Sequence, residues 1–145
     1  MATTSPAVAA SGFALETTDR LEIAGLVAAY GDAVSRRDAD AWSATWAMDA
    51  TWSLMGHEVT GRDAITALWL GAMAQFDAVS FISSLGAVTL AGDTATARCQ
   101  THEVLRTVGG AIRRVAGTYD DRFSRVDGRW LFSRRVFVVV IEDPA

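Results

Sequence analysis

Two tyrosines and a histidine are the side chains best suited to acid–base chemistry in this sequence. Tyr30 falls on the apolar face of a predicted helix, and Tyr119 and His102 fall in predicted strands. A phenol can hold a carbonyl or a developing oxyanion, and a histidine that titrates near neutrality can act as a general base. Each residue has an alternative interpretation. Tyr30 could be a core residue whose hydroxyl reaches a backbone group, Tyr119 could lie on an outward face, and His102 could face solvent or a dimer interface.

Asp121 shares one face of its predicted strand with Tyr119 and Gly117, because alternate residues of a strand point the same way. A glycine in a long strand leaves room for another group to approach. This face forms either a polar patch inside a pocket or an outer surface paired with arginines, and periodicity alone does not decide between them. An inward Arg134 or Arg135 would pair with a carboxylate such as Asp121, or with an anionic ligand group.

No local motif specifies a reaction. The sequence has no glycine-rich phosphate loop, no HExxH, no GxSxG and no acidic cluster with metal spacing. A metal site would have only His57, His102 and carboxylates, which nothing places together, so we expect neither a metal nor a cofactor. All 13 basic residues are arginine, which excludes a Schiff-base lysine. The single Cys99 excludes an internal disulfide and a multi-cysteine zinc site.

The composition predicts one folded domain. A chain of 145 residues, 50% of them apolar, can bury a sizeable core. A net charge of −4 argues against a nucleic-acid surface, and no apolar run is long enough to span a membrane. Residues 1–17 lack the basic start of a signal peptide, so we expect a flexible tail, a domain over residues 18–142 and a cytoplasmic location.

The elements that must position these side chains are three helices followed by long strands. The first helix is predicted to start at Asp19 as N-cap and to end near Ser35. Asp38 or Asp40 would cap a short second helix, and a third would cover residues 61 to about 75. The apolar patterns predict strands over residues 50–55, 78–90, 94–108, 111–126 and 129–141.

Asp127-Gly128 between the last two strands is a strong hairpin signal. Four of these strands exceed the usual five or six residues, so they must twist and curl. Helices followed by a long antiparallel sheet give an α+β fold. We expect a cone with one open mouth and a pocket for a small apolar molecule, which Trp69 and Met73 of the third helix could line.

Three stretches together resemble one known family, over about residues 19–140. They are LEIAGLVAAYGDAVSRRDADAWSATWAMDATWSL, GHEVTGRDAI and AGTYDDRFSRVDGRWLFSRR. Their order and spacing are similar to those of the SnoaL-like group of the nuclear transport factor 2-like superfamily. The resemblance implies a curved antiparallel or mixed sheet wrapped around N-terminal helices as a cone-shaped α+β barrel. It also implies an apolar cavity, no cofactor, and a homodimer or higher homo-oligomer.

Members of this family include dehydratases, a dehydrochlorinase, isomerases, polyketide cyclases, epoxide hydrolases and non-catalytic subunits, so the fold alone does not give the function. The scytalone dehydratase and dehydrochlorinase branch uses an Asp–His dyad. The resemblance places the dyad aspartate at Ser35 and its histidine at or beside Phe81, so both dyad residues are missing here.

Other family residues are partly retained. The oxyanion-hole tyrosine of the ketosteroid isomerases lines up with Tyr30, and their second oxyanion donor lines up near Tyr119. Their base aspartate falls near Leu54 and is therefore absent. A further pocket histidine of scytalone dehydratase lies on the strand that holds His102.

The first hypothesis is a cofactor-independent lyase or isomerase acting on a small apolar cyclic or aromatic substrate. Tyr30 and Tyr119 would polarise the substrate, and His102, oriented by Asp121, would move the proton. The residues expected to contact substrate are Ser35, Leu54, Trp69, Met73, Phe81 and Gly117. The alternative is a non-catalytic module that binds a hydrophobic ligand or dimerises. A weaker alternative is an epoxide hydrolase that uses Asp121 with Arg134 or Arg135.

Overall fold

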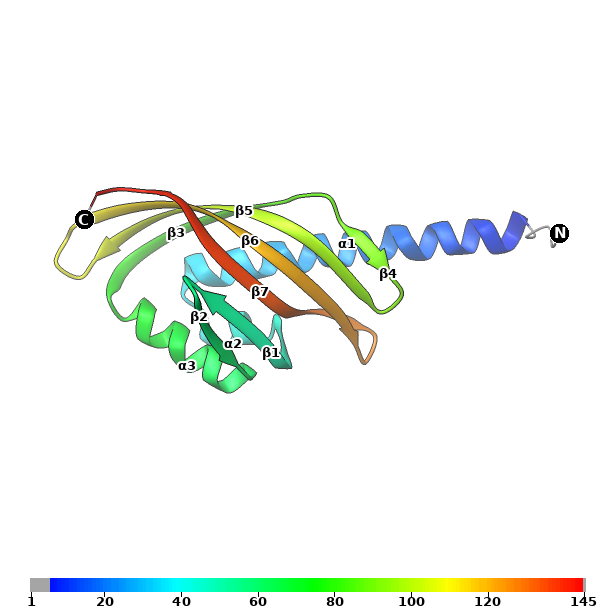
Figure 1. The fold of residues 1–145 in the computed structure, drawn as a ribbon, viewed down its shortest axis with the longest axis horizontal. Coiled ribbons are helices and arrows are strands. Elements are labelled where there is room, and N and C mark those ends of the chain that lie inside the picture. The colour runs from blue at the N-terminus through cyan, green and yellow to red at the C-terminus, as the bar shows by residue number, and fades with distance from the viewer. Residues whose placement is uncertain (1–5, 145) are drawn as a thin grey trace.

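The computed structural model describes residues 6–144, with side chains from residue 15 onward. Three helices and seven strands follow one another along this part of the chain (Figure 1). They are α1 (Pro6–Arg36), α2 (Ala39–Ser43), β1 (Trp46–Leu54), β2 (His57–Thr60), α3 (Arg62–Met73), β3 (Phe76–Leu85), β4 (Thr89–Ala91), β5 (Thr94–Thr107), β6 (Ile112–Val126) and β7 (Arg129–Glu142).

The strands form one mixed sheet in the order β2-β1-β7-β6-β5-β3, with β4 paired to β5. All the pairs are antiparallel except β1 with β7. The long strands β5, β6 and β7 curve over α1, and the helices lie on the concave side of the sheet (Figure 1). The predicted α+β fold with a curved sheet around N-terminal helices is confirmed.

The hairpin predicted at Asp127-Gly128 is confirmed. Both residues have positive φ, 50° and 78°, as a two-residue type I′ turn requires. Val126 pairs with Arg129 directly beside the turn. This turn sets the register of β6 against β7 as far as Phe123, and a one-residue shift between Arg122 and Phe123 then places Tyr119 opposite Phe137.

Helix α1 starts earlier than predicted, at Pro6 rather than after Asp19. Proline suits the first turn of a helix, and the following segment contains no residue that would stop one. Asp19 is therefore inside the helix, where tertiary partners bind its carboxylate, and its prediction as an N-cap is wrong. Residues 1–5 of the predicted tail lie outside the described residues, and the flexibility of residues 1–17 stays a prediction.

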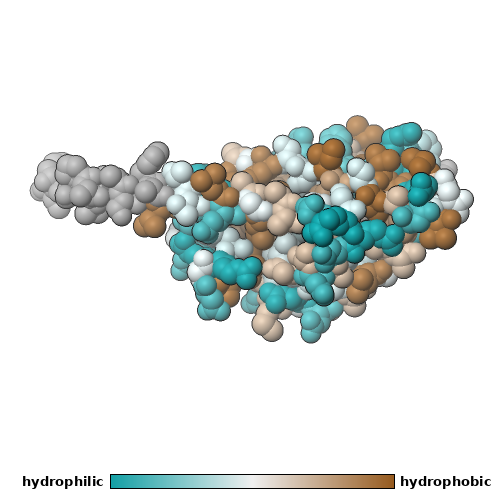
Figure 2. Space-filling model, turned by 180° about the vertical axis from the view of Figure 1, so that it is seen from behind, coloured by the Kyte–Doolittle hydropathy of each residue, from teal (hydrophilic) through white to brown (hydrophobic). Residues whose placement is uncertain are grey.

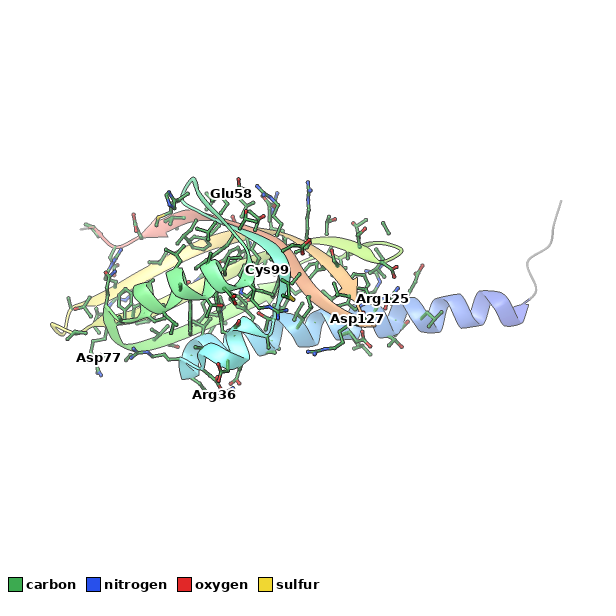
Figure 3. The ribbon with its side chains drawn as sticks, turned by 90° about the horizontal axis from the view of Figure 1, so that it is seen from below. Arg36, Glu58, Asp77, Cys99, Arg125 and Asp127 are labelled. Carbon is green, nitrogen blue, oxygen red and sulfur yellow. The ribbon has the colours of Figure 1, made fainter. Side chains whose placement is uncertain are left out.

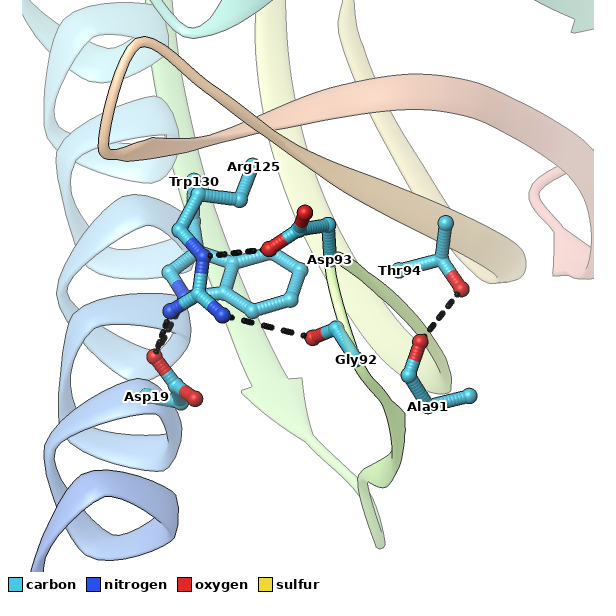
Figure 4. Close-up of polar contacts among 7 residues, drawn as sticks. All are labelled: Asp19, Ala91, Gly92, Asp93, Thr94, Arg125 and Trp130. Carbon is cyan, nitrogen blue, oxygen red and sulfur yellow. Dashed lines mark hydrogen bonds and ion pairs between the residues drawn. The ribbon is translucent and has the colours of Figure 1, made fainter.

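Asp19 instead ties α1 to the turns of the sheet (Figure 4). Arg125 donates to Asp19 at 2.6 Å and to Asp93 at 2.9 Å, and the indole N–H of Trp130 donates to Asp19 at 3.0 Å. The Arg125 guanidinium also lies 5.0 Å from the centre of the Trp130 ring. These contacts close the end of the cone beside the β6–β7 turn.

The region between α1 and α3 differs in detail from the prediction. Asp38 caps α2 as expected, accepting from the backbone N–H of Ala41 at 3.0 Å. Trp46, however, begins β1 rather than following Trp42 on one helix. The unpredicted strand β2 pairs with β1 through a two-residue turn at 55–56, where both residues have positive φ.

The core lies between the concave face of the sheet and the helices and is rich in aromatic rings. Trp42 and Trp69 stack with their centres 4.6 Å apart. Cys99 also lies in this interior (Figure 3), and burial raises the pKa of its thiol to about 12, so it is no nucleophile at neutral pH.

Several apolar side chains remain exposed on the described surface. They include Ile82, Val104, Val138 and Val140 on the convex face of the sheet, and Val108, Ile112 and Ile141 near the C-terminal end. Figure 2 shows hydrophobic residues gathered at the end of the molecule remote from the start of α1. The expected homodimer stays a prediction. Among the described residues, no helix has the length and apolarity needed to cross a membrane.

Candidate active site

A cavity of about 190 Å³ lies between the concave face of the sheet and helices α1 and α3. Its walls are mostly apolar and largely aromatic. It is lined by Tyr30, Val34, Trp52, Leu54, Met55, Trp69, Ala72, Met73, Phe76, Phe81, Glu103, Leu105, Arg113, Val115, Tyr119, Phe137, Val139 and Glu142. An apolar cavity of about 150 Å³ can hold benzene. This one therefore suits a single six-membered ring with small substituents.

Both tyrosines of the chain line this cavity. Tyr30 and Tyr119 are 3% and 4% exposed, and their hydroxyl oxygens lie 3.5 Å apart. The indole N–H of Trp52 donates to the Tyr119 oxygen at 3.2 Å. Because that oxygen acts as an acceptor here, the Tyr119 proton is available for Tyr30 or for a ligand.

An ion pair is buried behind the two tyrosine rings. The guanidinium carbon of Arg135 lies 4.4 Å from the centre of the Tyr30 ring and 3.7 Å from that of Tyr119. Asp121 accepts two hydrogen bonds from Arg135, at 2.6 and 3.0 Å. Burial raises the pKa of both phenols, more than the charge of Arg135 lowers it, so both remain protonated donors at neutral pH.

The face that carries Gly117, Tyr119 and Asp121 is the inner face of β6, since all three residues are buried. Asp121 nevertheless does not line the cavity. Both of its carboxylate oxygens accept hydrogen bonds from Arg135. The predicted role of Asp121 in orienting His102 is therefore wrong. Arg134 points to the opposite side, where it donates to Glu58 at 2.6 Å.

His102 lies outside the cavity. Its side chain is exposed on the convex face of β5, beside Gln100 and Val104. The prediction that His102 moves a proton in the pocket is corrected for that reason. His57 is exposed on β2, as expected. Within the described residues, no group of three or more histidine, cysteine or acidic side chains could hold a metal ion.

The titratable residue that sequence reasoning missed is Glu103, the next residue along β5. It lines the cavity, and burial raises the pKa of its carboxyl to about 7. Among the described residues, its carboxylate has no hydrogen bond or ion pair. Strand periodicity contains the signal, since the same face carries the buried Cys99, Thr101 and Leu105. A glutamate on such a face faces the interior.

The expected substrate contacts divide into two groups. Leu54, Trp69, Met73 and Phe81 line the cavity. Ser35 and Gly117 do not line it, so their predicted contact with substrate is corrected.

Both corrected residues have structural roles. The Ser35 hydroxyl accepts from the backbone N–H of Phe81 at 3.0 Å and donates to its carbonyl at 3.3 Å, which ties α1 to β3. A Cβ on Gly117 would lie 2.5 Å from the Phe137 ring, so this glycine makes room for that ring rather than for a ligand.

The exposed lining residues mark the mouth of the cavity. They are Met55, Arg113 and Glu142, of which Arg113 and Glu142 form an ion pair at 3.8 Å. Since both of these side chains are about half exposed, at 53% and 52%, the pair is screened by water and weak.

A curved mixed sheet wrapped around a long helix, with a cavity between them, defines the nuclear transport factor 2-like class of α+β proteins. The SnoaL-like domain family matches residues 15–136, and the chain belongs to that family. A comparison with curated protein sequences finds no match.

Solved structures show the same fold. A candidate scytalone dehydratase from Novosphingobium aromaticivorans is 20% identical, with 88% of each chain covered and a TM-score of 0.81. A hexachlorocyclohexane dehydrochlorinase from Novosphingobium barchaimii is 18% identical, with 90% of this chain and 92% of that chain covered and a TM-score of 0.81. A candidate dehydratase from Streptomyces avermitilis is 18% identical, with 86% and 99% covered and a TM-score of 0.76.

Proposed function

We propose that this protein is a cofactor-independent lyase or isomerase, which transfers a proton on a small, mostly apolar cyclic or aromatic substrate. One observation carries the proposal: the Glu103 carboxylate, which pairs with no described residue, lines the same cavity as the hydroxyls of Tyr30 and Tyr119. The names of the dehydratase and dehydrochlorinase neighbours agree with this class of reaction.

Glu103 is the base in this proposal. A carboxylate with a pKa of about 7 is substantially ionised near neutral pH and is a stronger base than an ordinary glutamate. It takes a proton from a carbon next to a substrate carbonyl, and the electrons of the C–H bond form an enolate. Tyr30 and Tyr119 donate hydrogen bonds to the enolate oxygen, where the negative charge develops.

The protonated Glu103 then completes either reaction. In an isomerisation it returns the proton to a different carbon of the enolate. In a dehydration it gives the proton to a hydroxyl on the β carbon. That hydroxyl leaves as water, while the enolate electrons form the new carbon–carbon double bond and the carbonyl is restored. Both reactions balance without a cofactor.

Two other mechanisms have less support. The Asp–His elimination would need side chains that Ser35 and Phe81 do not have. Epoxide hydrolysis by Asp121 with Arg134 or Arg135 would need these groups in the cavity. Asp121 and Arg135 instead pair behind the tyrosine rings, and Arg134 is on the other side.

The second candidate function is a non-catalytic module that binds a hydrophobic ligand. The mostly apolar lining of the cavity favours it, since a carrier needs only apolar walls and a few orienting polar groups. The two functions differ in whether Glu103 exchanges protons with a ligand.

The test is hydrogen exchange at carbon. The protein is incubated in D₂O with a panel of cyclic ketones, and deuterium at the carbon next to the carbonyl is measured by mass spectrometry. We expect exchange above the buffer rate, a loss of about 10²-fold or more in Glu103→Gln, and no change in the matched control His102→Gln. If no ketone exchanges, the carrier function is favoured. Loss of exchange in His102→Gln alone would refute the role of Glu103.

A further inference from the structure

The balance of charge around the cavity points to a second class of ligand. Behind the tyrosine rings, the charge of Arg135 is balanced by Asp121 in a buried bidentate pair. At the mouth, Arg113 faces Glu142. Among the described residues that line the cavity, Glu103 is the one charged group left without a partner.

The groups that face Glu103 from the surrounding elements do not balance it. Directly opposite on β3 and β6 are the apolar residues Phe81 and Val115. The titratable or charged lining residues on the other elements are Tyr30 on α1, Tyr119 and Arg113 on β6, and Glu142 on β7. The lining residues of α3 and β1 are not charged. The cavity therefore carries one uncompensated negative charge when Glu103 is ionised.

The walls of the cavity also favour a cation. Seven aromatic residues line it: Tyr30, Trp52, Trp69, Phe76, Phe81, Tyr119 and Phe137. The face of an aromatic ring attracts a positive charge, and the attraction is stronger where water is excluded. A volume of about 190 Å³ leaves room for one ring and a short arm.

We infer that the cavity is also a binding site for a ring-sized organic cation, a protonated primary amine on a short arm, whose ammonium group pairs with Glu103 while its ring contacts the aromatic walls. This inference shares Glu103 with the proposed function but requires no turnover.

The pairing has a defined dependence on pH. An alkyl ammonium keeps its proton up to about pH 10, whereas burial places the pKa of Glu103 at about 7. Below that pH the amine must displace the proton of Glu103, so binding releases a proton and the affinity rises by up to tenfold per pH unit. A neutral ligand of the same shape prefers the protonated carboxyl, so its affinity does not rise with pH.

Isothermal titration calorimetry with benzylamine, and with benzyl alcohol as neutral control, tests this inference. We expect benzylamine to bind up to about tenfold more tightly at about pH 8 than at about pH 6, with proton release at the lower pH seen as a dependence on buffer ionisation enthalpy. Glu103→Gln should lose at least tenfold in affinity for benzylamine at about pH 8 and keep its affinity for benzyl alcohol, which shows that its cavity is intact.

Glu22→Gln is the matched control, since Glu22 is exposed on α1 and does not line this cavity, and it should bind benzylamine as the wild type does. The inference is overturned if benzylamine binds no better than benzyl alcohol at about pH 8, or if Glu103→Gln binds benzylamine as tightly as Glu22→Gln does. Proton release by the wild-type protein gives a readout that needs no variant. Amine binding without ketone exchange would overturn the proposed enzyme alone, and ketone exchange without amine binding would overturn this inference alone.

Discussion

Phe81 on β3 lies directly opposite Glu103 on β5 in the antiparallel register, and both side chains line the cavity. Phe81 is at or beside the position where the resemblance places the histidine of the Asp–His dyad. The other dyad position, Ser35, contacts the backbone of Phe81. These two positions therefore hold no Asp–His dyad, and the cavity contains the titratable group of Glu103 one strand away.

Glu103 should make the stability of the protein depend on pH. Burial raises the pKa of its carboxyl from 4.5 to about 7, so between these values the folded state holds a proton that the unfolded state has lost. The free energy of unfolding therefore falls as the pH rises through this window and levels off above it. Glu103→Gln removes this effect, and its stability relative to the wild type should increase by about 1–3 kcal/mol between about pH 4.5 and 7.5.

Urea unfolding at several pH values measures that difference. His102→Gln is the control, since its side chain is exposed on the other face of the same strand. A constant offset between Glu103→Gln and the wild type across the window would contradict a buried, unpaired carboxylate.

The tyrosine hydroxyls should matter for turnover more than for stability. With a ketone that exchanges, Tyr30→Phe and Tyr119→Phe should each lower kcat at least tenfold, because each removes a donor to the developing oxyanion. KM should change less, because the ring and its packing remain. Steady-state exchange kinetics give both constants. Unchanged kcat in both variants would assign the two tyrosines to packing alone.

Periodicity predicted the long strands, because alternation is set by the backbone and long strands display it clearly. It did not decide which face of β6 points inward, because both faces of that segment mix polar and apolar residues. The Asp127-Gly128 turn was found because its residue types favour positive φ. The strand β2 was missed because its turn contains Met55, a residue that does not signal positive φ. The start of α1 was missed because Asp19 looks like a cap in sequence, whereas distant residues bind its carboxylate.

The candidate site was predicted only in part, for a related reason. Tyr30 was placed in the interior because it belongs to a clear apolar face of α1, whereas the face of β6 that carries Tyr119 was left open by periodicity. On β5, the titration of histidine near neutral pH favoured His102 as the base. The alternation of apolar residues along the same strand indicates instead that Glu103 faces the interior. Pairing between Asp121 and Arg135 was foreseen as one possibility, but its position behind the tyrosine rings depends on how the sheet curves.

Removing only one partner of the Asp121–Arg135 pair should lower the free energy of unfolding strongly. Both side chains are buried, at 0% and 1% exposed, so removing one partner leaves an uncompensated charge in the core. Asp121→Leu or Arg135→Met alone should therefore cost about 3–5 kcal/mol of stability. The double variant should cost clearly less than the sum, because no buried charge remains. Urea unfolding of the wild type, the two single variants and the double variant gives the four free energies of this double-mutant cycle. If the two single losses simply add in the double variant, water reaches the pair.

A side chain at Gly117 should destabilise the protein, because it would collide with Phe137 in the wall of the cavity. A Cβ there would lie 2.5 Å from two ring atoms of Phe137 and 2.8 Å from the carbonyl oxygen of Val138. Because Phe137 lines the cavity, a shift of its ring changes the cavity wall, and the carbonyl belongs to the paired strands β6 and β7 and cannot move freely. Gly117→Ala should thus cost about 1–3 kcal/mol of stability and weaken the binding of any ring-sized ligand.

Gly71→Ala is the matched control for that substitution. Gly71 lies within α3 with no atom within 4 Å of its added Cβ, and alanine is the better helix former. This variant should gain about 0.5–1 kcal/mol and leave ligand binding unchanged. Thermal unfolding and benzyl alcohol titrations of both variants provide the comparison. If Gly117→Ala kept full stability but lost ligand affinity, Phe137 would have moved into the cavity without strain, and the ring rather than the backbone would set the size of the site.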